Sequence, residues 1–227
     1  MVKLVVCVVV AGCQSNHPAA KPIDAPCTPT VHTLARRGPP QFEAFKWLGG
    51  SSDGKRVAYA VSHLGPGSGE PVGGAHVMEA GASKAVLDKS YFAVHGDESM
   101  LPKVEDGIVT DLGGEITAAG VELGANLPRS QAWCTAGGKI YNDTGAIELK
   151  VSRAPCVQTP AKQAVSWEVC AGTRCTRFES TACLDGEVTL LDLARSGNVD
   201  WAVVDVATKP FGDAEFHLYQ VAGISGS

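Results

Sequence analysis

The sequence has little positive charge and no long apolar segment, and both shortages exclude classes of function. Its 227 residues carry 19 lysines and arginines against 24 aspartates and glutamates, a formal net charge of −5 with neutral histidines. The basic residues are dispersed, so the chain lacks the electrostatic footprint of a nucleic-acid-binding protein and the polybasic patch that binds anionic lipid. A transmembrane helix needs roughly 20 consecutive apolar residues, and the apolar run near the N-terminus is far shorter.

Recognisable catalytic and nucleotide-binding motifs are also missing. The glycine-rich stretch at 67–74 suggests a phosphate-binding loop, but Pro71 interrupts it and no helix follows to present amide groups to an anion. Gly50 to Gly54 matches the G-x-S-x-G pattern of a hydrolase nucleophile, with Ser52 at its centre. A nucleophile elbow leads into a helix, whereas the residues after Gly54 predict a β-strand. We therefore interpret Ser52 as a turn residue.

The first thirteen residues have the pattern of an export signal. Lys3 supplies a positive charge, Leu4 to Val10 is apolar, and Val10-Ala11-Gly12-Cys13 places small residues before a cysteine. This pattern resembles the signal of bacterial lipoproteins, whose lipobox ends in the cysteine that receives lipid. The resemblance implies removal of residues 1–12, lipidation of Cys13 and export to a membrane surface. By analogy with enteric bacteria, Gln14 after the cysteine implies the outer membrane.

A tether, residues 13–40, is predicted between the lipid and the folded part. Residues 14–40 hold six of the thirteen prolines and show no hydrophobic periodicity, which favours an extended linker. At about 3.1 Å per residue this linker would reach roughly 80 Å. The folded domain is then expected to occupy residues 41–227.

The number of cysteines predicts a disulfide framework in this domain. Of eight cysteines, Cys7 leaves with the signal and Cys13 is lipidated under the lipoprotein interpretation. Six remain, an even number in an oxidising compartment, so three disulfides are expected among fifteen possible pairings. The six candidates are Cys27, Cys134, Cys156, Cys170, Cys175 and Cys183.

One pairing has a local argument. Cys170 and Cys175 stand either side of a four-residue turn that contains Gly172, and opposed residues of a hairpin lie within disulfide range. The alternative is a zinc site formed by the last four cysteines, which the absence of any C-x-x-C spacing disfavours; we predict no metal and no cofactor. Cys27 lies inside the tether, so a disulfide from it would staple the tether to the body.

Short apolar segments between turn residues predict a mainly β protein of α+β type, with antiparallel sheets in a sandwich-like or propeller-fragment-like arrangement. One helical segment is expected near 99–123, where apolar residues recur at three- and four-residue steps. Its glycines predict a break near Gly113. The strands divide into two halves, 41–97 and 134–227, joined by this segment.

The stretch Ser52 to Tyr59 resembles the strand–turn–strand signature of TolB-like β-propeller repeats. Asp53-Gly54 matches the tight turn of the signature, and Val57 begins the apolar residues of its buried strand. The resemblance covers about ten of the 227 residues and implies a β-rich domain outside the cytoplasm. A similar order of turn, strand, loop and strand follows Ser196-Gly197 near the C-terminus.

The Gly- and Pro-rich loop predicted over Leu64–Gly74 is the candidate ligand-binding element. Its candidate residues are His63, Ser68, Glu70 and His76. The two histidines flank the loop without a third ligand nearby, so they are interpreted as surface residues and not as a metal site.

These features favour a lipid-anchored cell-envelope protein of binding or structural type, with no catalytic constellation. Its expected partners are the membrane, through the N-terminal lipid, and an envelope protein, peptidoglycan or a small ligand; nucleic acid is not expected. The alternative is a periplasmic hydrolase that uses Ser52 or an acid pair at Asp97 and Glu98.

Overall fold

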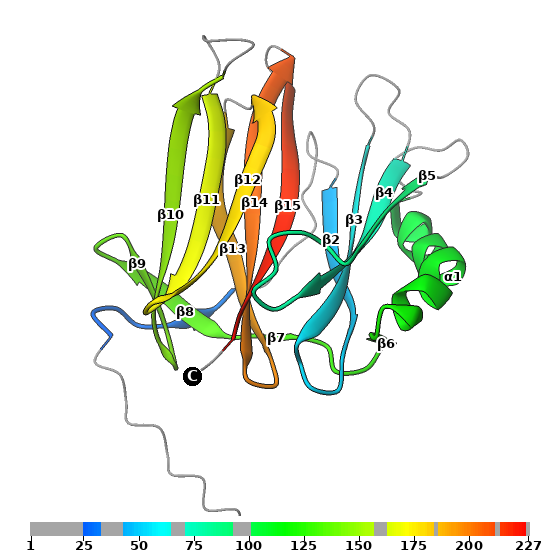
Figure 1. The fold of residues 1–227 in the computed structure, drawn as a ribbon, viewed down its shortest axis with the longest axis horizontal. Helices are drawn as coiled ribbons and strands as arrows, with labels where there is room; N and C mark the ends of the chain where they lie inside the picture. The colour runs from blue at the N-terminus through cyan, green and yellow to red at the C-terminus, as the bar shows by residue number, and fades with distance from the viewer. Residues whose placement is uncertain are drawn as a thin grey trace, which may run out of the picture.

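Three antiparallel sheets and one helix make up the part of the chain that the structure describes (Figure 1). The structure is a computed structural model, and it describes residues 25–32, 43–64, 71–92, 101–156, 163–183, 186–211 and 214–225. The predicted mainly β fold with antiparallel sheets and one helical segment is confirmed. Cys13 and the acid pair Asp97 and Glu98 lie outside the described residues.

The first strands of the body form a five-stranded sheet with the order β5-β4-β3-β2-β6. Its strands are β2 Glu43–Gly50, β3 Arg56–Leu64, β4 Pro71–Glu79, β5 Leu87–Phe92 and β6 Glu122–Leu123. Successive side chains of a strand point to opposite faces. In β3, Val57 and Tyr59 therefore enter one apolar core, while Ala58 and Ala60 enter another. Both faces of this sheet are covered.

Helix α1, Leu101–Ala118, covers one face of the five-stranded sheet and lies at one end of the molecule (Figure 1). Val104, Ile108 and Ile116 are fully buried on the side of the helix that meets the sheet. The small side chains of Ala58 and Ala75 face them from the strands. Among the described residues, no helix has the length and apolarity needed to span a bilayer.

The helix is continuous, so the predicted break near Gly113 is wrong. A Cβ atom at Gly113 would lie 3.1 Å from Leu123 Cδ1, and one at Gly107 would collide with the Tyr91 hydroxyl of β5. These glycines lower helix propensity, but they let the helix approach its neighbours closely. Most of the stability of a helix in a protein comes from packing its apolar face, and that packing outweighs the propensity loss here.

Strand β4 begins inside the stretch predicted to be the loop Leu64–Gly74. A Cβ atom at Gly73 would lie 2.7 Å from the Val61 carbonyl oxygen and 2.9 Å from Val104 Cγ1. Glycine is therefore required where the helix meets the strand, a known reason for glycine inside a strand. The glycines that suggested an irregular loop belong in part to a packed strand.

The second part of the chain forms long strands in two sheets. One sheet has the order β1-β8-β9-β10-β11-β12 and the other the order β15-β14-β13-β7. Their bounds are β1 Thr30–Val31, β7 Arg129–Ser130, β8 Ala132–Ala136, β9 Lys139–Asn142, β10 Gly145–Pro155, β11 Gln163–Ala171, β12 Arg174–Cys183, β13 Gly186–Ser196, β14 Val199–Phe211 and β15 Ala214–Ser225.

The main core lies where the three sheets meet, with β14 in its interior. Residues 199–206 of β14 are all buried, as expected for a strand covered on both faces. On one face the Trp201 ring passes over Gly223, where it also approaches Ala80 of the first sheet. On the other side, Trp167 Nε1 of β11 donates a 2.6 Å hydrogen bond to Gln220 Oε1 of β15. The two predicted halves thus share one core.

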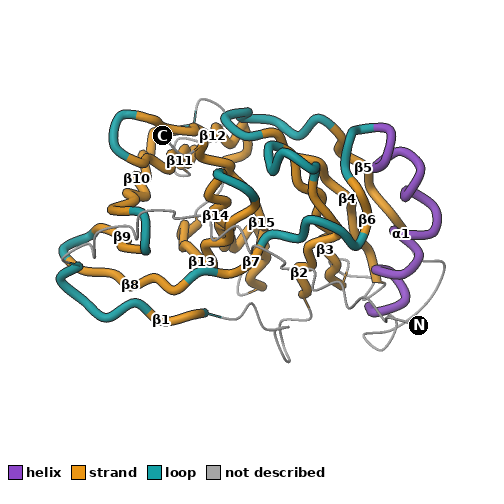
Figure 2. The backbone as a smooth tube through the Cα atoms, turned by 90° about the horizontal axis from the view of Figure 1, so that it is seen from below, coloured by secondary structure: helices purple, strands orange, loops and turns teal. Residues whose placement is uncertain are grey.

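Part of the predicted tether is attached to the body. Cys27 forms a disulfide with Cys134 of β8, and Thr30 and Val31 pair with β8 as strand β1. Figure 2 shows β1 and β8 running side by side along one edge of the molecule. His32 stacks on Trp133 with ring centroids 4.0 Å apart. The sequence predicts that a disulfide from Cys27, if formed, attaches the tether to the body. The structure contains this disulfide.

Candidate functional site

A groove of about 1310 Å³ opens where two turns of the fold meet, and we call it the turn groove. Its walls come from residues within 25–29, 51–54, 124–132, 142–143 and 195–197. The β2–β3 turn and the β13–β14 turn lie side by side at the lower end of Figure 1. A Cβ atom at Gly197 would lie 3.1 Å from the Asp53 carbonyl oxygen, so the close approach depends on glycine. The two turns are those of the internal sequence similarity.

Ser52 sits on the first of these turns. Gly54 N donates to Ser51 O at 3.0 Å, and Ser51 Oγ donates to Asp53 Oδ1 at 2.7 Å. This hydrogen bond, followed by one from the Lys55 amide, lowers the pKa of the Asp53 carboxyl. Strand β3 begins two residues after Gly54, so the prediction that Ser52 is a turn residue is confirmed. Among the described residues, no group forms a hydrogen bond with the Ser52 hydroxyl.

Arg195 is the centre of a polar network at the edge of the turn groove. Its Nε donates to Asp200 Oδ1 at 2.8 Å, and its two Nη atoms donate to Asp143 at 3.1 and 2.9 Å. Gln131 Oε1 accepts a further bond of 2.9 Å from Arg195 Nη2. Burial opposes the charge of Arg195, but the hydrogen bonds and charges of both aspartates outweigh it and raise its pKa.

A turn at 142–145 completes this network. Asn142, which is 2 % exposed, donates from Nδ2 to Gln131 Oε1 at 3.1 Å. Its Oδ1 accepts hydrogen bonds from the amide and the hydroxyl of Thr144. Thr144 Oγ1 also lies 3.1 Å from Asp200 Oδ2. The network is densely bonded, which is how buried polar groups stabilise a structure, and it holds the groove wall in one conformation.

A second buried carboxyl lies close to the groove. Asp192 is fully buried, and its Oδ2 accepts a 2.7 Å hydrogen bond from Ser130 Oγ, a group that lines the groove. Among the described residues, Oδ1 of Asp192 has no hydrogen-bond partner. Burial raises the pKa of Asp192 to about 6, although the bonds from Ser130 and the Leu193 amide and the charge of His32 act in the opposite direction.

A smaller, mostly apolar groove of about 580 Å³ lies on the other side of the N-terminal segment. Trp133, Ile140, Leu149 and Leu190 line it, and His32 stands at its edge. Residues 27–29 line the turn groove, whereas Thr30 and His32 line this apolar groove. The stapled segment is therefore a wall shared by two cavities, of which the turn groove has the more polar lining.

Only part of the candidate ligand set around 63–76 lies among the described residues. Ser68 and Glu70 lie outside the described residues, as does the side chain of His63. The strand register places His76 opposite Tyr59 and His63 opposite Val72, four residues further along β3. His76 Nδ1 lies 3.1 Å from Asp88, and its ring stacks on Tyr59 at 4.9 Å. Burial lowers the pKa of His76, while Asp88 opposes this shift.

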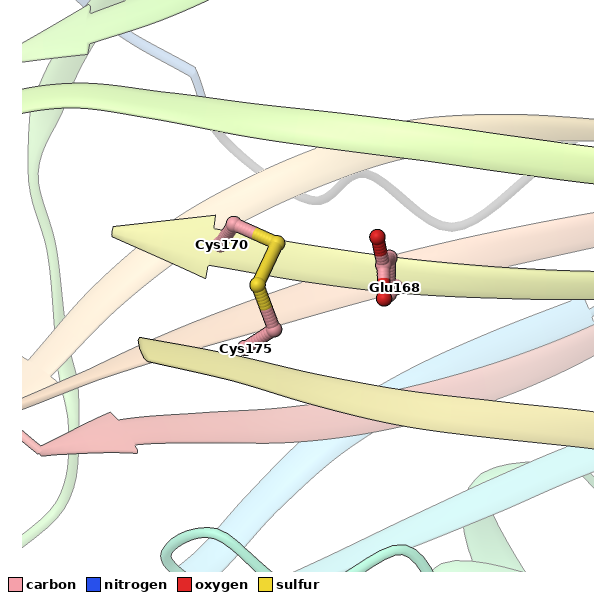
Figure 3. A group of neighbouring side chains, drawn as sticks. All are labelled: Glu168, Cys170 and Cys175. Carbon is pink, nitrogen blue, oxygen red and sulfur yellow. A yellow bond between two sulfur atoms is a disulfide. The ribbon is translucent and has the colours of Figure 1, made fainter. Parts of the chain in front are cut away.

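The predicted hairpin disulfide is confirmed: Cys170 and Cys175 are opposed in the β11–β12 ladder and bonded, with Cα atoms 4.1 Å apart (Figure 3). Cys156 is also disulfide-bonded, and the side chain of Cys183 lies outside the described residues. The alternative of a zinc site formed by four thiolates is therefore wrong, because Cys156, Cys170 and Cys175 are disulfide-bonded.

Arg195, Asp200 and Asp192 were not predicted as site residues. Asp192 did carry a signal, because it interrupts the apolar run Leu190-Leu191-Asp192-Leu193 of a predicted buried strand, and acidic residues are rarely fully buried without a partner. Arg195 carried none, since its partners come from segments distant in the sequence. No protein-family model, curated protein or solved structure matches this chain.

Proposed function

We propose that this chain is a lipid-anchored cell-envelope protein of the binding type, and that the turn groove is its ligand site. The observation that carries the proposal is a groove of about 1310 Å³ with one wall formed by the stapled N-terminal segment. Ala25 at the groove follows Cys13 by twelve positions, a reach of about 40 Å at most. The ligand would therefore be bound close to the membrane surface.

The lining favours a polar ligand. The space is surrounded by serine side chains, Asn126, Arg129 and the Arg195–Asp143 ion pair. Arg129 is exposed, and among the described residues it forms no ion pair or side-chain hydrogen bond. It can therefore bind an incoming carboxylate or phosphate with its planar donor fork. Peptidoglycan fragments, which carry peptide carboxylates and sugar hydroxyls, have this chemistry.

The anchoring and the binding are tested separately. Cys13→Ser should move the protein from the membrane fraction to the soluble fraction; an unchanged membrane fraction contradicts the anchor. Binding of soluble peptidoglycan fragments is measured by calorimetry on the chain from residue 14 onward. Arg129→Glu should weaken binding at least tenfold, whereas Lys84→Glu, an exposed change outside the groove, should leave it unchanged. No binding, or equal loss in both variants, contradicts the groove as the ligand site.

A hydrolase is the second candidate, and the observation that favours it is Ser130 bonded to the buried Asp192 at 2.7 Å. Among the described residues, none is bonded to Ser52 as a base, and Asp97 and Glu98 lie outside the part of the chain that the structure describes. A carboxylate with a raised pKa is suited to accept the serine proton. Hydrolysis of p-nitrophenyl butyrate that is lost in Ser130→Ala and retained in Ser52→Ala would support this function. Activity equal in both variants, or none in the parent, contradicts it.

A further inference from the structure

We propose that the Cys170–Cys175 disulfide is a thiol–disulfide exchange site that accepts thiol-containing peptides and proteins as its substrate. It lies at the end of the β11–β12 hairpin (Figure 3), and neither cysteine lines the turn groove. Three features support the proposal: unequal access to the two sulfur atoms, a neighbouring carboxylate, and a hairpin that other contacts hold together.

The two cysteines differ in exposure. Cys175 is exposed to solvent, whereas Cys170 is 3 % exposed, although the two residues are paired and lie on the same face of the hairpin. The Cys175 sulfur is therefore the one that an incoming thiolate reaches more easily. Exchange rates depend on which sulfur is attacked and on its accessibility, so this asymmetry defines Cys175 as the attacked sulfur and Cys170 as the leaving group.

Glu168 lies beside the disulfide. Its carboxylate oxygen and both sulfur atoms lie within 4.8 Å of one another, and Figure 3 shows the side chain on the same side of β11 as the bridge. Lys150 Nζ of the neighbouring strand lies 3.6 Å from Glu168 Oε1. The carboxylate is thus placed to relay a proton between solvent and the Cys170 sulfur, and the lysine offsets its charge.

The hairpin does not depend on the bridge for its register. Trp167 of β11 stacks on Phe178 of β12 with ring centroids 4.3 Å apart. Thr176 Oγ1 donates a 3.1 Å hydrogen bond to the Gly223 carbonyl oxygen in the next sheet. The bridge joins residues only 5 apart in sequence, whereas Cys27–Cys134 spans 107. Closing a short loop restricts the unfolded chain far less than closing a long one, so the hairpin bridge can open at a smaller cost in stability than Cys27–Cys134.

The chemistry balances without a further oxidant. A substrate thiolate attacks Cys175 Sγ, the Cys170–Cys175 bond breaks, and the electron pair leaves on Cys170 Sγ, which takes a proton relayed by Glu168. A second substrate thiolate then attacks the substrate sulfur of this mixed disulfide, the bond to Cys175 breaks, and the electron pair leaves on Cys175 Sγ, which takes a proton from solvent. The substrate leaves with a new disulfide, and the protein leaves with two thiols. The substrate dithiol is oxidised and the bridge is reduced by the same two electrons.

The first experiment compares disulfides within the same protein. The full chain from residue 14 onward is equilibrated with graded reduced glutathione, quenched with N-ethylmaleimide, and mapped by peptide mass spectrometry. Cys170 and Cys175 should be alkylated at a glutathione concentration at least tenfold lower than Cys27 and Cys134, with an unchanged circular dichroism spectrum. Simultaneous reduction of these bridges, or earlier reduction of Cys27–Cys134, overturns the proposal.

Two single variants test the direction of attack. Cys170→Ser leaves the thiol of the exposed Cys175, and Cys175→Ser leaves the thiol of the buried Cys170. With Ellman's reagent, the thiol of the first variant should react at least tenfold faster than that of the second. Equal rates would contradict the assigned roles. Far-ultraviolet circular dichroism of both variants checks that the hairpin remains folded.

Glu168→Gln tests the proton relay. It should slow exchange of the parent disulfide with glutathione and remove an inflection from the rate–pH profile, while leaving the equilibrium between bridge and glutathione unchanged. Glu148→Gln, a carboxylate that also lies 3.6 Å from Lys150 Nζ, is the matched control and should leave the profile intact. A Glu168→Gln profile identical to that of the parent contradicts the relay.

Discussion

Asp192 makes the stability of the protein depend on pH in one window. Its carboxyl has a pKa of about 6 in the fold, against about 3.9 in an unfolded chain. Between these values the folded state binds more protons than the unfolded state, so the free energy of unfolding falls as pH rises from about 4 to about 6. The loss is up to about 3 kcal/mol and is complete above that window.

Asp192→Asn should remove this dependence, because the amide keeps the shape but cannot ionise. The free energy of unfolding of the variant minus that of the parent should be larger at pH 7 than at pH 4. Urea unfolding at the two pH values measures this difference. Ser130→Ala removes the hydrogen bond that holds the pKa down, so it should shift the window to higher pH. An unchanged pH profile in Asp192→Asn would show that the carboxyl titrates normally.

The two aspartates bonded to Arg195 differ in burial, and their substitutions should differ accordingly. The side chain of Asp200 is 10 % exposed and that of Asp143 is 67 % exposed. Asp200→Ala leaves Arg195, Gln131 and Thr144 without a shared acceptor, and we expect a loss of about 3 kcal/mol. Asp143→Ala removes a surface pair and should cost less than about 1 kcal/mol. Equal losses in urea unfolding would contradict the assignment of the network to the protein interior.

At the scale of elements, helix α1 offers a matched pair of glycines. Gly114 has no heavy atom within 4 Å of a Cβ built on it, whereas a Cβ at Gly107 would collide with Tyr91. Gly114→Ala should therefore raise the free energy of unfolding by up to about 1 kcal/mol through helix propensity. Gly107→Ala should lower it by about 1 kcal/mol despite the same propensity gain. Adding Tyr91→Phe should restore part of that loss, because it removes the nearest atom; stabilisation by Gly107→Ala alone would show that the contact is not restrictive.

Elements were predicted well where the determinants are local. The Cys170–Cys175 bridge follows from a four-residue spacing and a glycine turn, and Ser52 was correctly placed on a turn because the residues after Gly54 form a strand. The position of the helix was predicted correctly, but the break predicted at Gly113 is wrong. The sequence shows that glycine lowers helix propensity, but it does not show the sheet that packs against these glycines. The same reason explains the strand found within Leu64–Gly74.

The candidate site was mostly beyond sequence reasoning. Arg195 meets Asp143 across 52 positions and Gln131 across 64, and no spacing rule connects them. The turn groove arises where five segments distant in sequence converge, so its existence depends on the packing of the sheets. The ligand residues predicted from composition, His63 and His76, are separated by the register of β3 and β4, which a loop-rich sequence does not reveal.

At the scale of the whole molecule, the Cys27–Cys134 and Cys170–Cys175 bridges should contribute unequally to stability. In the chain-entropy model, a loop of 107 residues is worth about 4.7 kcal/mol and a loop of 5 about 2 kcal/mol. Replacing both Cys27 and Cys134 with serine should therefore destabilise the protein roughly twice as much as replacing both Cys170 and Cys175. Urea unfolding of the two double variants measures this. A larger loss from the hairpin pair would contradict the loop-length argument.

The Cys27–Cys134 bridge also decides how the chain carries mechanical load. A pull applied between the N-terminal end and the C-terminus crosses from Cys27 directly to β8 through sulfur, and residues 28–133 lie off that path. The five-stranded sheet, helix α1 and the β2–β3 turn then experience no tension while the bridge is closed. Force would reach them only after reduction, which would place the stretch of about 107 residues between the two cysteines on the loaded path.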